Sequence, residues 1–281
     1  MIAHRGGAGL WPENTTLAVV ESARAGYDGA EIDVQLTHDG KLVVFHDFIP
    51  GARTCRDQGG HPLPGMQRPL HEWTYAELAI LDVGSPESRP AGISPARRDV
   101  ERIPLLSDMI AAIRSVRGDF RLFVELKTSF MNRTLSAAPE AVAEAAIAVL
   151  REANYLHNAV FVGFDWPGLL RAKWLSSAAE CWFTTEPAYA GPFEDRSWAG
   201  GFDPRNFGGS CARAIKAAGG EGWFAHYSAV SAGSVDEAHA LGLKAAVWTV
   251  NEPSQMRDLV CLGVDAICSD RPDRLAEVVA G

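Results

Sequence analysis

The chain has 281 residues, of which 47% are hydrophobic and 22% charged, a balance that supports a packed core and excludes an intrinsically disordered protein. Its 26 basic and 35 acidic side chains give a formal net charge of −9. Binding to nucleic acid or anionic membranes depends on basic patches, so we expect neither. No apolar run approaches the roughly 18 residues of a membrane span, so we expect no stable membrane insertion. The expected partner is a small molecule, and the oligomeric state stays open.

Short strand-like runs alternate with amphipathic helices along most of the chain. Runs rich in Val, Ile and Phe with intervening helices are typical of parallel strands buried on both faces. We predict strands at residues 2–4, 30–34, 42–46, 120–126, 159–164, 180–184, 222–226 and 244–250, with a last short run at 266–268. We predict helices at residues 15–25, 106–116, 139–152, 166–176, 210–218, 235–241 and 253–262.

This alternation predicts an α/β fold, a TIM-type (β/α)8 barrel, because about eight βα units in roughly 250 residues is the size of that barrel. A doubly wound sheet is the alternative, but it should carry a glycine-rich βα turn with an acidic residue further on. The sequence has no such turn. Since no internal repeat or linker divides the chain, we predict a single barrel domain over residues 1–281.

The connection between the second and third predicted strands is irregular. Only eight residues separate Asp33 from Leu42, and they contain the turn signal Asp39-Gly40. A parallel crossover usually needs a dozen or more residues and a helix. We therefore expect a hairpin or an extended return in place of the second helix.

Residues 48–102 form the second irregular stretch. They are rich in Pro, Gly and Arg and contain one short helix candidate at 74–81. Long stretches with little regular structure are usually functional loops or lids. We predict an insertion after the third strand that packs over one end of the barrel and, because it begins two residues after His46, covers part of a pocket there.

Five cysteines are scattered along the chain without a CxxC pair: Cys55, Cys181, Cys211, Cys261 and Cys268. This pattern predicts free thiols in a reducing compartment and argues against a zinc site. The chain opens in a strand-like segment with no signal-peptide pattern before it. We therefore expect a cytoplasmic protein; if a signal peptide had been removed, the protein would be periplasmic or secreted.

Polar side chains stand at the predicted carboxyl ends of several strands, where barrel enzymes carry their catalytic groups. These candidates are His4, Arg5, Glu31, Asp33, His46, Asp47, Glu125, Lys127, Trp248 and Asn251. Residues two apart on a strand share a face, so Glu31 and Asp33 should point the same way, as should Glu125 and Lys127. Converging carboxylates repel one another unless a cation neutralises them. Oxygen ligands suit Mg²⁺, Ca²⁺ or Mn²⁺ rather than zinc.

Each part of this pattern also has an ordinary structural interpretation. A histidine at the end of an apolar strand is often a satisfied core residue, and carboxylates spaced i, i+2 usually mark a solvated strand face. A Glu and a Lys at that spacing are most often a surface ion pair. Their shared placement at the ends of buried strands favours a functional site, because uncompensated charges there would be costly.

The candidate set points to phosphate-ester chemistry. Arg5 could hold phosphate oxygens in a bidentate fork and Lys127 as a point charge, while a metal shares the developing negative charge. The imidazoles of His4 and His46 could divide the proton transfers to and from the reacting oxygens. The sequence has no GxSxG nucleophile motif and no P-loop.

Five segments, in chain order, resemble the glycerophosphodiester phosphodiesterase family of the phospholipase C-like phosphodiesterase superfamily: IAHRGGAGLWPENT, AEIDVQLTHDGKLVVFHD, FVELK, AVWTVN and GVDAICSDRPD. The match is spread from Met1 to about Asp273. The resemblance implies a TIM-type barrel. It also implies metal-dependent hydrolysis of glycerophosphodiesters to sn-glycerol 3-phosphate and an alcohol.

The resemblance also implies residue roles. His4 and His46 match the acid–base pair. Three carboxylates match the ligands of one divalent cation, for which we expect Mg²⁺ or Ca²⁺: Glu31, Asp33 and Glu125. Residues matching phosphate contacts or positions that border the site are Arg5, Lys127, Trp248 and Glu13.

Two segments depart from the family pattern near the expected position of the alcohol. Gly163-Phe164-Asp165 lacks the serine that often precedes Phe-Asp, and Arg53-Thr54-Cys55 stands where the family has Arg-Thr-Thr. These departures leave the preferred head group open.

Three other functions stay open at this point. A lysophospholipase D or a cyclising phospholipase-like phosphodiesterase could use the same barrel, and a lipid-cleaving enzyme should show an apolar surface, for which the candidates are Trp11, Phe48, Ile49 and Pro50. Glu125 speaks against the sphingomyelinase D branch. A catalytically silent binding module is the third alternative, and the intact histidines and carboxylates argue against it.

Overall fold

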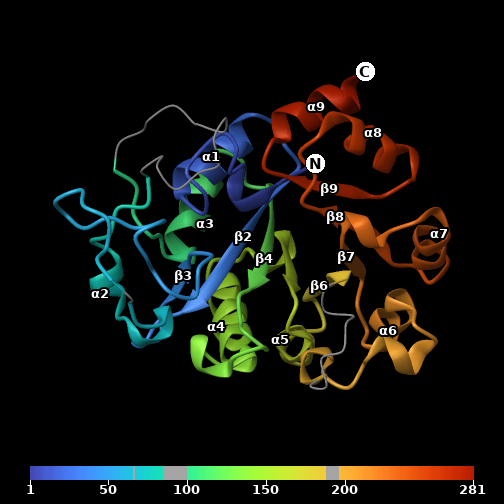
Figure 1. Cartoon of the computed structure of the whole chain (residues 1–281), viewed down its shortest axis with the longest axis horizontal. Helices are drawn as coiled ribbons and strands as arrows, with labels where there is room; N and C mark the ends of the chain where they lie inside the picture. The colour runs from blue at the N-terminus through green and yellow to red at the C-terminus, as the bar shows by residue number, and fades with distance from the viewer. Residues whose placement is uncertain (66, 85–99, 188–195) are drawn as a thin grey trace.

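Eight parallel strands close into a barrel in this computed structural model, which describes residues 1–65, 67–84, 100–187 and 196–281 (Figure 1). Around the barrel the strands are β1 (Ile2–Ala3), β2 (Gly29–Leu36), β4 (Arg121–Leu126), β5 (Ala159–Gly163), β6 (Glu180–Thr185), β7 (Gly222–His226), β8 (Lys244–Trp248) and β9 (Ala266–Ser269). β1 pairs with both β2 and β9 and so closes the barrel. The predicted TIM barrel is confirmed.

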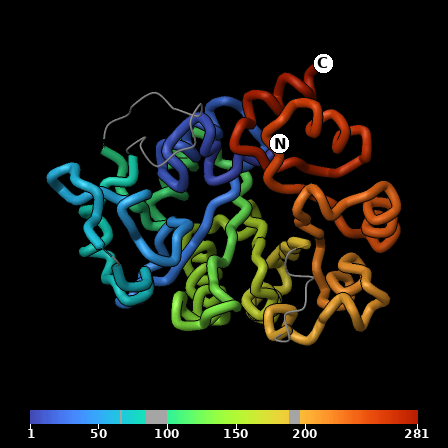
Figure 2. Tube along the Cα trace, viewed as in Figure 1, coloured from blue at the N-terminus to red at the C-terminus, as the bar shows by residue number. Residues whose placement is uncertain are grey.

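A helix follows every barrel strand and packs on the outside of the sheet (Figures 1 and 2). The helices are α1 (Thr16–Arg24), α3 (Leu106–Arg114), α4 (Pro139–Glu152), α5 (Trp166–Leu175), α6 (Cys211–Ala217), α7 (Ala232–Ala240), α8 (Pro253–Cys261) and α9 (Pro272–Ala280). The sequence analysis missed α9. Among the described helices, none combines the length and the apolar character needed to cross a membrane.

The irregular connection after β2 is a hairpin. β3 (Leu42–Val44) runs antiparallel to β2, with Val34 opposite Val44, and lies outside the closed barrel. Residues 42–46 are therefore not the third strand of the barrel, and the short run at 266–269 supplies its eighth strand. The chain returns to the barrel through α3, which completes the crossover from β2 to β4.

Residues 48–102 extend from this hairpin, and positions 66 and 85–99 of this range lie outside the described residues. The predicted helix at 74–81 is shorter than expected, as α2 spans Tyr75–Leu78. Apolar side chains of this segment and Ile103 pack on Val43 and Phe45 of the hairpin in one cluster. The segment contributes Cys55, Leu63, Leu70, Leu78 and Leu81. The segment therefore has a small core of its own beside the barrel.

Alternation along the strands divides the sheet into two faces. Ala30, Ile32 and Val34 of β2 point outward and join the core beneath the helices, so Glu31 and Asp33 between them point into the barrel. Apolar residues of the other strands fill the barrel interior: Ile2, Phe123, Val160, Val162, Trp182, Phe224, Ala246 and Cys268. This packed interior forms the floor beneath the charged side chains at the carboxyl ends.

Candidate active site

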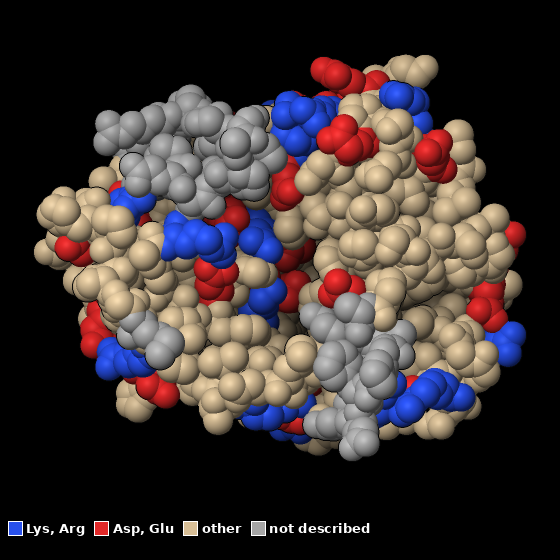
Figure 3. All heavy atoms as spheres, viewed as in Figure 1, with Lys and Arg blue, Asp and Glu red and all other residues tan. Residues whose placement is uncertain are grey.

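A cavity of about 190 Å³ lies at the carboxyl ends of the strands. Figure 3 shows acidic and basic side chains gathered in a hollow near the middle of the face drawn there. The cavity is lined by His4, Arg5, Glu31, Asp33, His46, Glu125, Lys127, Phe164, Thr184, Glu186, Phe224 and Trp248. The eight predicted site residues thus meet in one place, although they come from β2, β4 and β8 and from residues that follow β1, β3 and β4.

The turn after β1 positions Arg5. Arg5 has φ 49° and Gly6 has φ 80°, so two successive residues occupy the left-handed region. Gly6 is needed there because a Cβ atom would lie 2.8 Å from the Cβ of Ala18 in α1. As a result, the backbone N–H of Arg5 donates to Glu31 Oε2 over 2.9 Å. The turn therefore orients both the guanidinium and a buried carboxylate.

Three carboxylates form the centre of the site. Glu31, Asp33 and Glu125 each offer an oxygen atom within 4.8 Å of the others, and Glu31 and Asp33 are only 2% and 1% exposed. Burial, together with the negative charges of Asp33 and Glu125, raises the pKa of Glu31 well above its usual value. Both causes disfavour the ionised form of Glu31 in the metal-free site. The all-oxygen donor set suits a hard divalent cation.

Two cations contact the same carboxylates. Lys127 Nζ lies 3.1 Å from Asp33 Oδ1 and 2.9 Å from Glu125 Oε1, and Arg5 Nε lies 3.6 Å from Asp33 Oδ2. Burial alone would raise the pKa of Asp33, but Lys127 and other nearby positive groups hold it below its usual range. Burial lowers the pKa of Arg5 and Lys127, but neighbouring carboxylates, Asp33 above all, raise both overall. Both side chains stay cationic.

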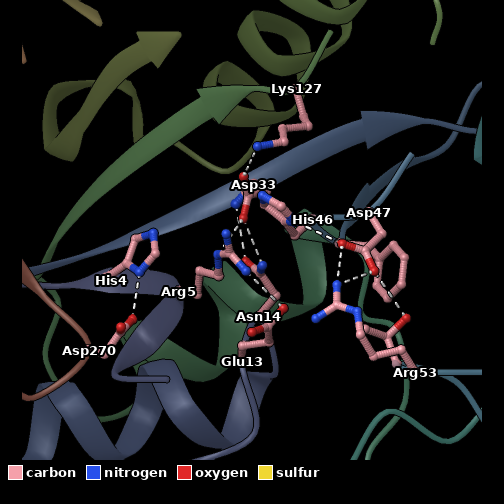
Figure 4. Close-up of polar contacts among 12 residues, drawn as sticks. His4, Arg5, Glu13, Asn14, Asp33, His46, Asp47, Arg53, Lys127 and Asp270 are labelled. Carbon is pink, nitrogen blue, oxygen red and sulfur yellow. Dashed lines mark hydrogen bonds and ion pairs between the residues drawn. The ribbon is translucent and has the colours of Figure 1, made fainter. Parts of the chain in front are cut away.

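Each cavity histidine has a carboxylate on its Nδ1 atom. His4 Nδ1 lies 2.6 Å from Asp270 Oδ1, and His46 Nδ1 lies 2.9 Å from Asp47 Oδ1. An ionised carboxylate only accepts hydrogen bonds, so these contacts assign the proton of each neutral ring to Nδ1 and leave Nε2 as the exchanging atom. In Figure 4, His4 and His46 lie on either side of Asp33 and Arg5.

Trp248 and Asn251 support the site in different ways. The Trp248 indole N–H donates to the carbonyl of Phe224 over 3.2 Å, so only the ring is available to the cavity, where Phe164 packs against it edge-on. Asn251 does not line the cavity. Its amide donates to Asp270 Oδ2 over 2.7 Å and thereby holds the carboxylate that contacts His4.

Three positioning residues were missed by the sequence analysis. Asp270 contacts His4, and the Asn14 amide donates to Asp33 Oδ2 over 2.8 Å. Gln35, buried on β2, donates to the carbonyls of Phe45 and Asp47 over 2.8 and 3.0 Å and so fixes the backbone that carries His46. The alternation on β2 already put Gln35 on the face of Asp33, which was a usable signal.

A closed parallel barrel with a charged cavity at the carboxyl ends of its strands is the architecture of a TIM-barrel enzyme. Residues 4–274 match the Glycerophosphoryl diester phosphodiesterase family. The chain belongs to this family, which is the one its motifs resemble.

Known relatives agree over almost the whole length. A glycerophosphodiester phosphodiesterase of Bacillus altitudinis is 28% identical over 281 residues, which cover 99% of this chain and 97% of the relative. The crystal structure of a glycerophosphoryl diester phosphodiesterase from Silicibacter pomeroyi superposes with a TM-score of 0.86 at 29% identity, covering 99% of this chain and 92% of that one. An Oleispira antarctica phosphodiesterase, solved with the product sn-glycerol-3-phosphate, shares the fold with a TM-score of 0.73 at 24% identity over 100% and 96% of the two chains.

Proposed function

We propose that this enzyme hydrolyses glycerophosphodiesters to sn-glycerol 3-phosphate and an alcohol, with a divalent cation and a pair of histidines. One observation carries the mechanism: two histidines, each with a carboxylate on Nδ1, flank a cavity in which three carboxylates and two cations converge. Family membership supports the reaction class.

Glu31, Asp33 and Glu125 are the proposed ligands of one divalent cation, Mg²⁺ or Ca²⁺. The convergence of three carboxylate oxygens within 4.8 Å of one another supports this assignment, because a bound cation would offset the repulsion that helps to raise the pKa of Glu31. When bound, such an ion neutralises the carboxylates and stabilises negative charge that develops on phosphate oxygens.

Arg5 and Lys127 are the proposed phosphate-binding residues. Arg5 Nε is buried and has no hydrogen-bond acceptor among the described residues. Both Arg5 and Lys127 line the cavity, so the guanidinium and the ammonium can each attract a phosphate oxygen there. Trp248 offers an apolar ring surface to the substrate from β8, three strands around the barrel from β2.

His4 and His46 are the proposed acid and base. One Nε2 atom accepts a proton from the attacking hydroxyl as the new oxygen–phosphorus bond forms. The other donates a proton to the alcohol oxygen as the bond between that oxygen and phosphorus breaks. Because attack and departure occur on opposite sides of phosphorus, two histidines on opposite sides of the cavity suit this division. Whether the attacking hydroxyl belongs to water or to the glycerol 2-position is left to experiment.

The apolar residues expected for a lipid-cleaving enzyme give no support to the lysophospholipase alternative. Trp11, Phe48 and Ile49 are half-buried and Pro50 is buried.

The proposed compartment is the cytoplasm, supported by five free cysteines, three of them buried.

Release of sn-glycerol 3-phosphate from glycerophosphocholine, with and without exhaustive chelation, tests the proposed function. We expect release that chelation abolishes and added Mg²⁺ or Ca²⁺ restores. Full activity after chelation would contradict the metal assignment. Activity confined to lysophospholipids would favour the lysophospholipase alternative, and inactivity towards every phosphodiester would favour a binding module.

A further inference from the structure

A second cavity, of about 210 Å³, adjoins the first one. Three side chains line both of them: Phe164, Thr184 and Glu186. The other described residues around it are Thr185, Arg196, Trp198, Asp203, Pro204, Arg205, Gly209 and Cys211. We call this space the side cavity. The alcohol part of a substrate whose phosphate lies in the first cavity would enter it by extending past Phe164 and Glu186.

Acidic and basic groups balance one another in the side cavity. Glu186 has no hydrogen bond or ion pair among the described residues, although it borders the cavity that holds the phosphate-binding residues. Farther in, Asp203 lies 2.6 Å from Arg205 and 3.9 Å from Arg196. Among the described lining residues the two carboxylates and two guanidiniums balance, so these side chains offer both acceptors and donors.

Aromatic rings supply the remaining surface. Phe164 and Trp198 both line the side cavity, and Trp198 is held in place by an edge-on contact with Trp166 at 5.2 Å between ring centroids. Phe164 is fixed by its neighbour Asp165, which accepts a 2.8 Å hydrogen bond from Thr128 and binds Arg133. The rings therefore form rigid apolar walls against which C–H groups can pack.

A second space that also reaches Phe164 has fewer charged groups in its described lining. A smaller groove of about 120 Å³ is lined, besides Phe164, by Phe48, Glu125, Lys127, Thr128, Ser129, Phe130 and Met131. It has no charged group beyond the two that belong to the phosphate site. Of these two spaces, the side cavity is the larger and is the one whose described lining has charged groups beyond those of the phosphate site.

We propose that the side cavity binds the alcohol part of the substrate and selects a neutral polyhydroxylated head group, such as glycerol or inositol; this inference rests on the proposed function. Hydroxyl groups donate to Glu186 and accept from Arg205, while the C–H faces of the polyol pack on Phe164 and Trp198. A quaternary ammonium cannot donate a hydrogen bond, and the balanced charges of the described lining residues give it no net attraction. Space for on the order of seven waters is enough for either polyol.

Three substrates and three variants test the proposal. The substrates are glycerophosphoinositol, glycerophosphocholine and the methyl ester of glycerol phosphate, which has no head group to fill the side cavity. The variants are Glu186→Ala, Glu186→Gln and the control Glu252→Gln, which removes a carboxylate that is 68% exposed and lines neither cavity.

The wild-type enzyme should prefer the inositol ester to the choline ester. Glu186→Ala should lower kcat/KM for the inositol ester, relative to the methyl ester, by about 10- to 100-fold, the effect of one hydrogen bond to a charged group. Glu186→Gln keeps an acceptor and should recover most of that loss. Glu252→Gln should leave the ratio unchanged.

Two results would overturn the proposal. Equal losses in Ala and Gln variants, confined to the choline ester, would identify Glu186 as a binding site for a cation. Equal losses on all three esters would make Glu186 part of the catalytic site instead. If the wild-type enzyme cleaved none of the esters, the proposed function itself would fail, and this outcome is distinct from the other two.

Discussion

The two cavity histidines differ in how their carboxylate partners are held. Asp270, the partner of His4, accepts from the neutral amide of Asn251, whereas Asp47, the partner of His46, forms an ion pair with Arg53 at 2.8 Å. In both cases a second polar group fixes the carboxylate, and the carboxylate fixes the ring. Each Nε2 atom is thereby held toward the cavity before substrate binds, which is the preorganisation that proton transfer requires.

Replacing either histidine by alanine should lower kcat on glycerophosphocholine by about 10²–10⁴-fold, because each ring is expected to transfer one of the two protons. The double variant should lose less than the product of the two single losses, since the rings act as a unit. Steady-state kinetics of His4→Ala, His46→Ala and the double variant provide the measurement.

A substrate with an activated leaving group distinguishes the two histidines. It needs no acid to protonate the departing oxygen, so it should rescue whichever single variant has lost the acid and leave the other impaired. The exposed His157, which lies just before β5 at the amino-terminal end of that strand, provides the control substitution to alanine. Near-wild-type rates in both active-site variants would contradict the proposed mechanism.

Strand β2 organises most of the site. Three successive inward positions carry Glu31, Asp33 and Gln35, which supply two proposed metal ligands and the amide that holds the backbone of residues 45–47. The hairpin to β3 makes this possible, because it brings residues 45–47 back beside the same end of β2. One strand thus sets the relative position of the carboxylate cluster and His46.

Gln35→Met should reduce both stability and kcat. Methionine fills a similar volume but cannot donate to the two carbonyls, and leaving buried acceptors unpaired costs about 1–3 kcal/mol. The free energy of unfolding should fall by that amount, and kcat should fall more than KM rises because His46 loses its support. Gln67→Met, the same change at a glutamine that lines neither the catalytic cavity nor the side cavity, is the matched control. Unaltered kcat in Gln35→Met would show that His46 needs no support from β2.

The sequence predicted well the features that depend on neighbouring residues of the chain. Period-two alternation placed Glu31 and Asp33 on one face, and the structure has both in the cavity. The short connection with Asp39-Gly40 indicated a hairpin or an extended return, but the sequence analysis still counted residues 42–46 as a barrel strand, because a run of three buried apolar residues looks alike in either position. The contact between His4 and Asp270 joins residues 266 positions apart and exists only once the barrel has closed. The catalytic and metal-binding roles stay predictions.

Barrel closure joins the first and last strands of the molecule. β1 pairs with β9 in parallel, with Ile2 opposite Cys268 and Ala3 opposite Ser269. This register brings His4, directly after β1, next to Asp270, directly after β9. In Figure 2 the N-terminal segment, at the label N, lies beside the red C-terminal segment. The site therefore depends on the closed barrel as a whole, and the charges gathered in it should in turn affect the stability of the whole molecule.

Glu31→Gln should stabilise the metal-free enzyme while destroying its response to metal. Because the pKa of Glu31 is raised above its usual 4.5, the folded metal-free protein loses stability as the pH rises from about 4.5 through the raised pKa. Glutamine cannot ionise, so the stability of the variant should exceed that of the wild type by a margin that grows over this pH range. Each kcal/mol gained should raise Tm by roughly 2–4 °C.

Added metal should reverse the order of stability of the wild type and Glu31→Gln. A cation that binds only the folded wild-type protein stabilises it in proportion to the logarithm of metal concentration over Kd, whereas Glu31→Gln has lost a proposed ligand and should gain much less. Thermal unfolding from pH 5 to 8, with chelator and with Mg²⁺ or Ca²⁺, measures both effects, and Glu252→Gln provides an exposed carboxylate as control. A wild-type Tm that did not change with either metal would contradict the metal site, because a ligand that binds the native state must stabilise that state. If Glu31→Gln were instead less stable than wild type without metal, the carboxylate would be held by its contact with the Arg5 backbone more strongly than its neighbours repel it.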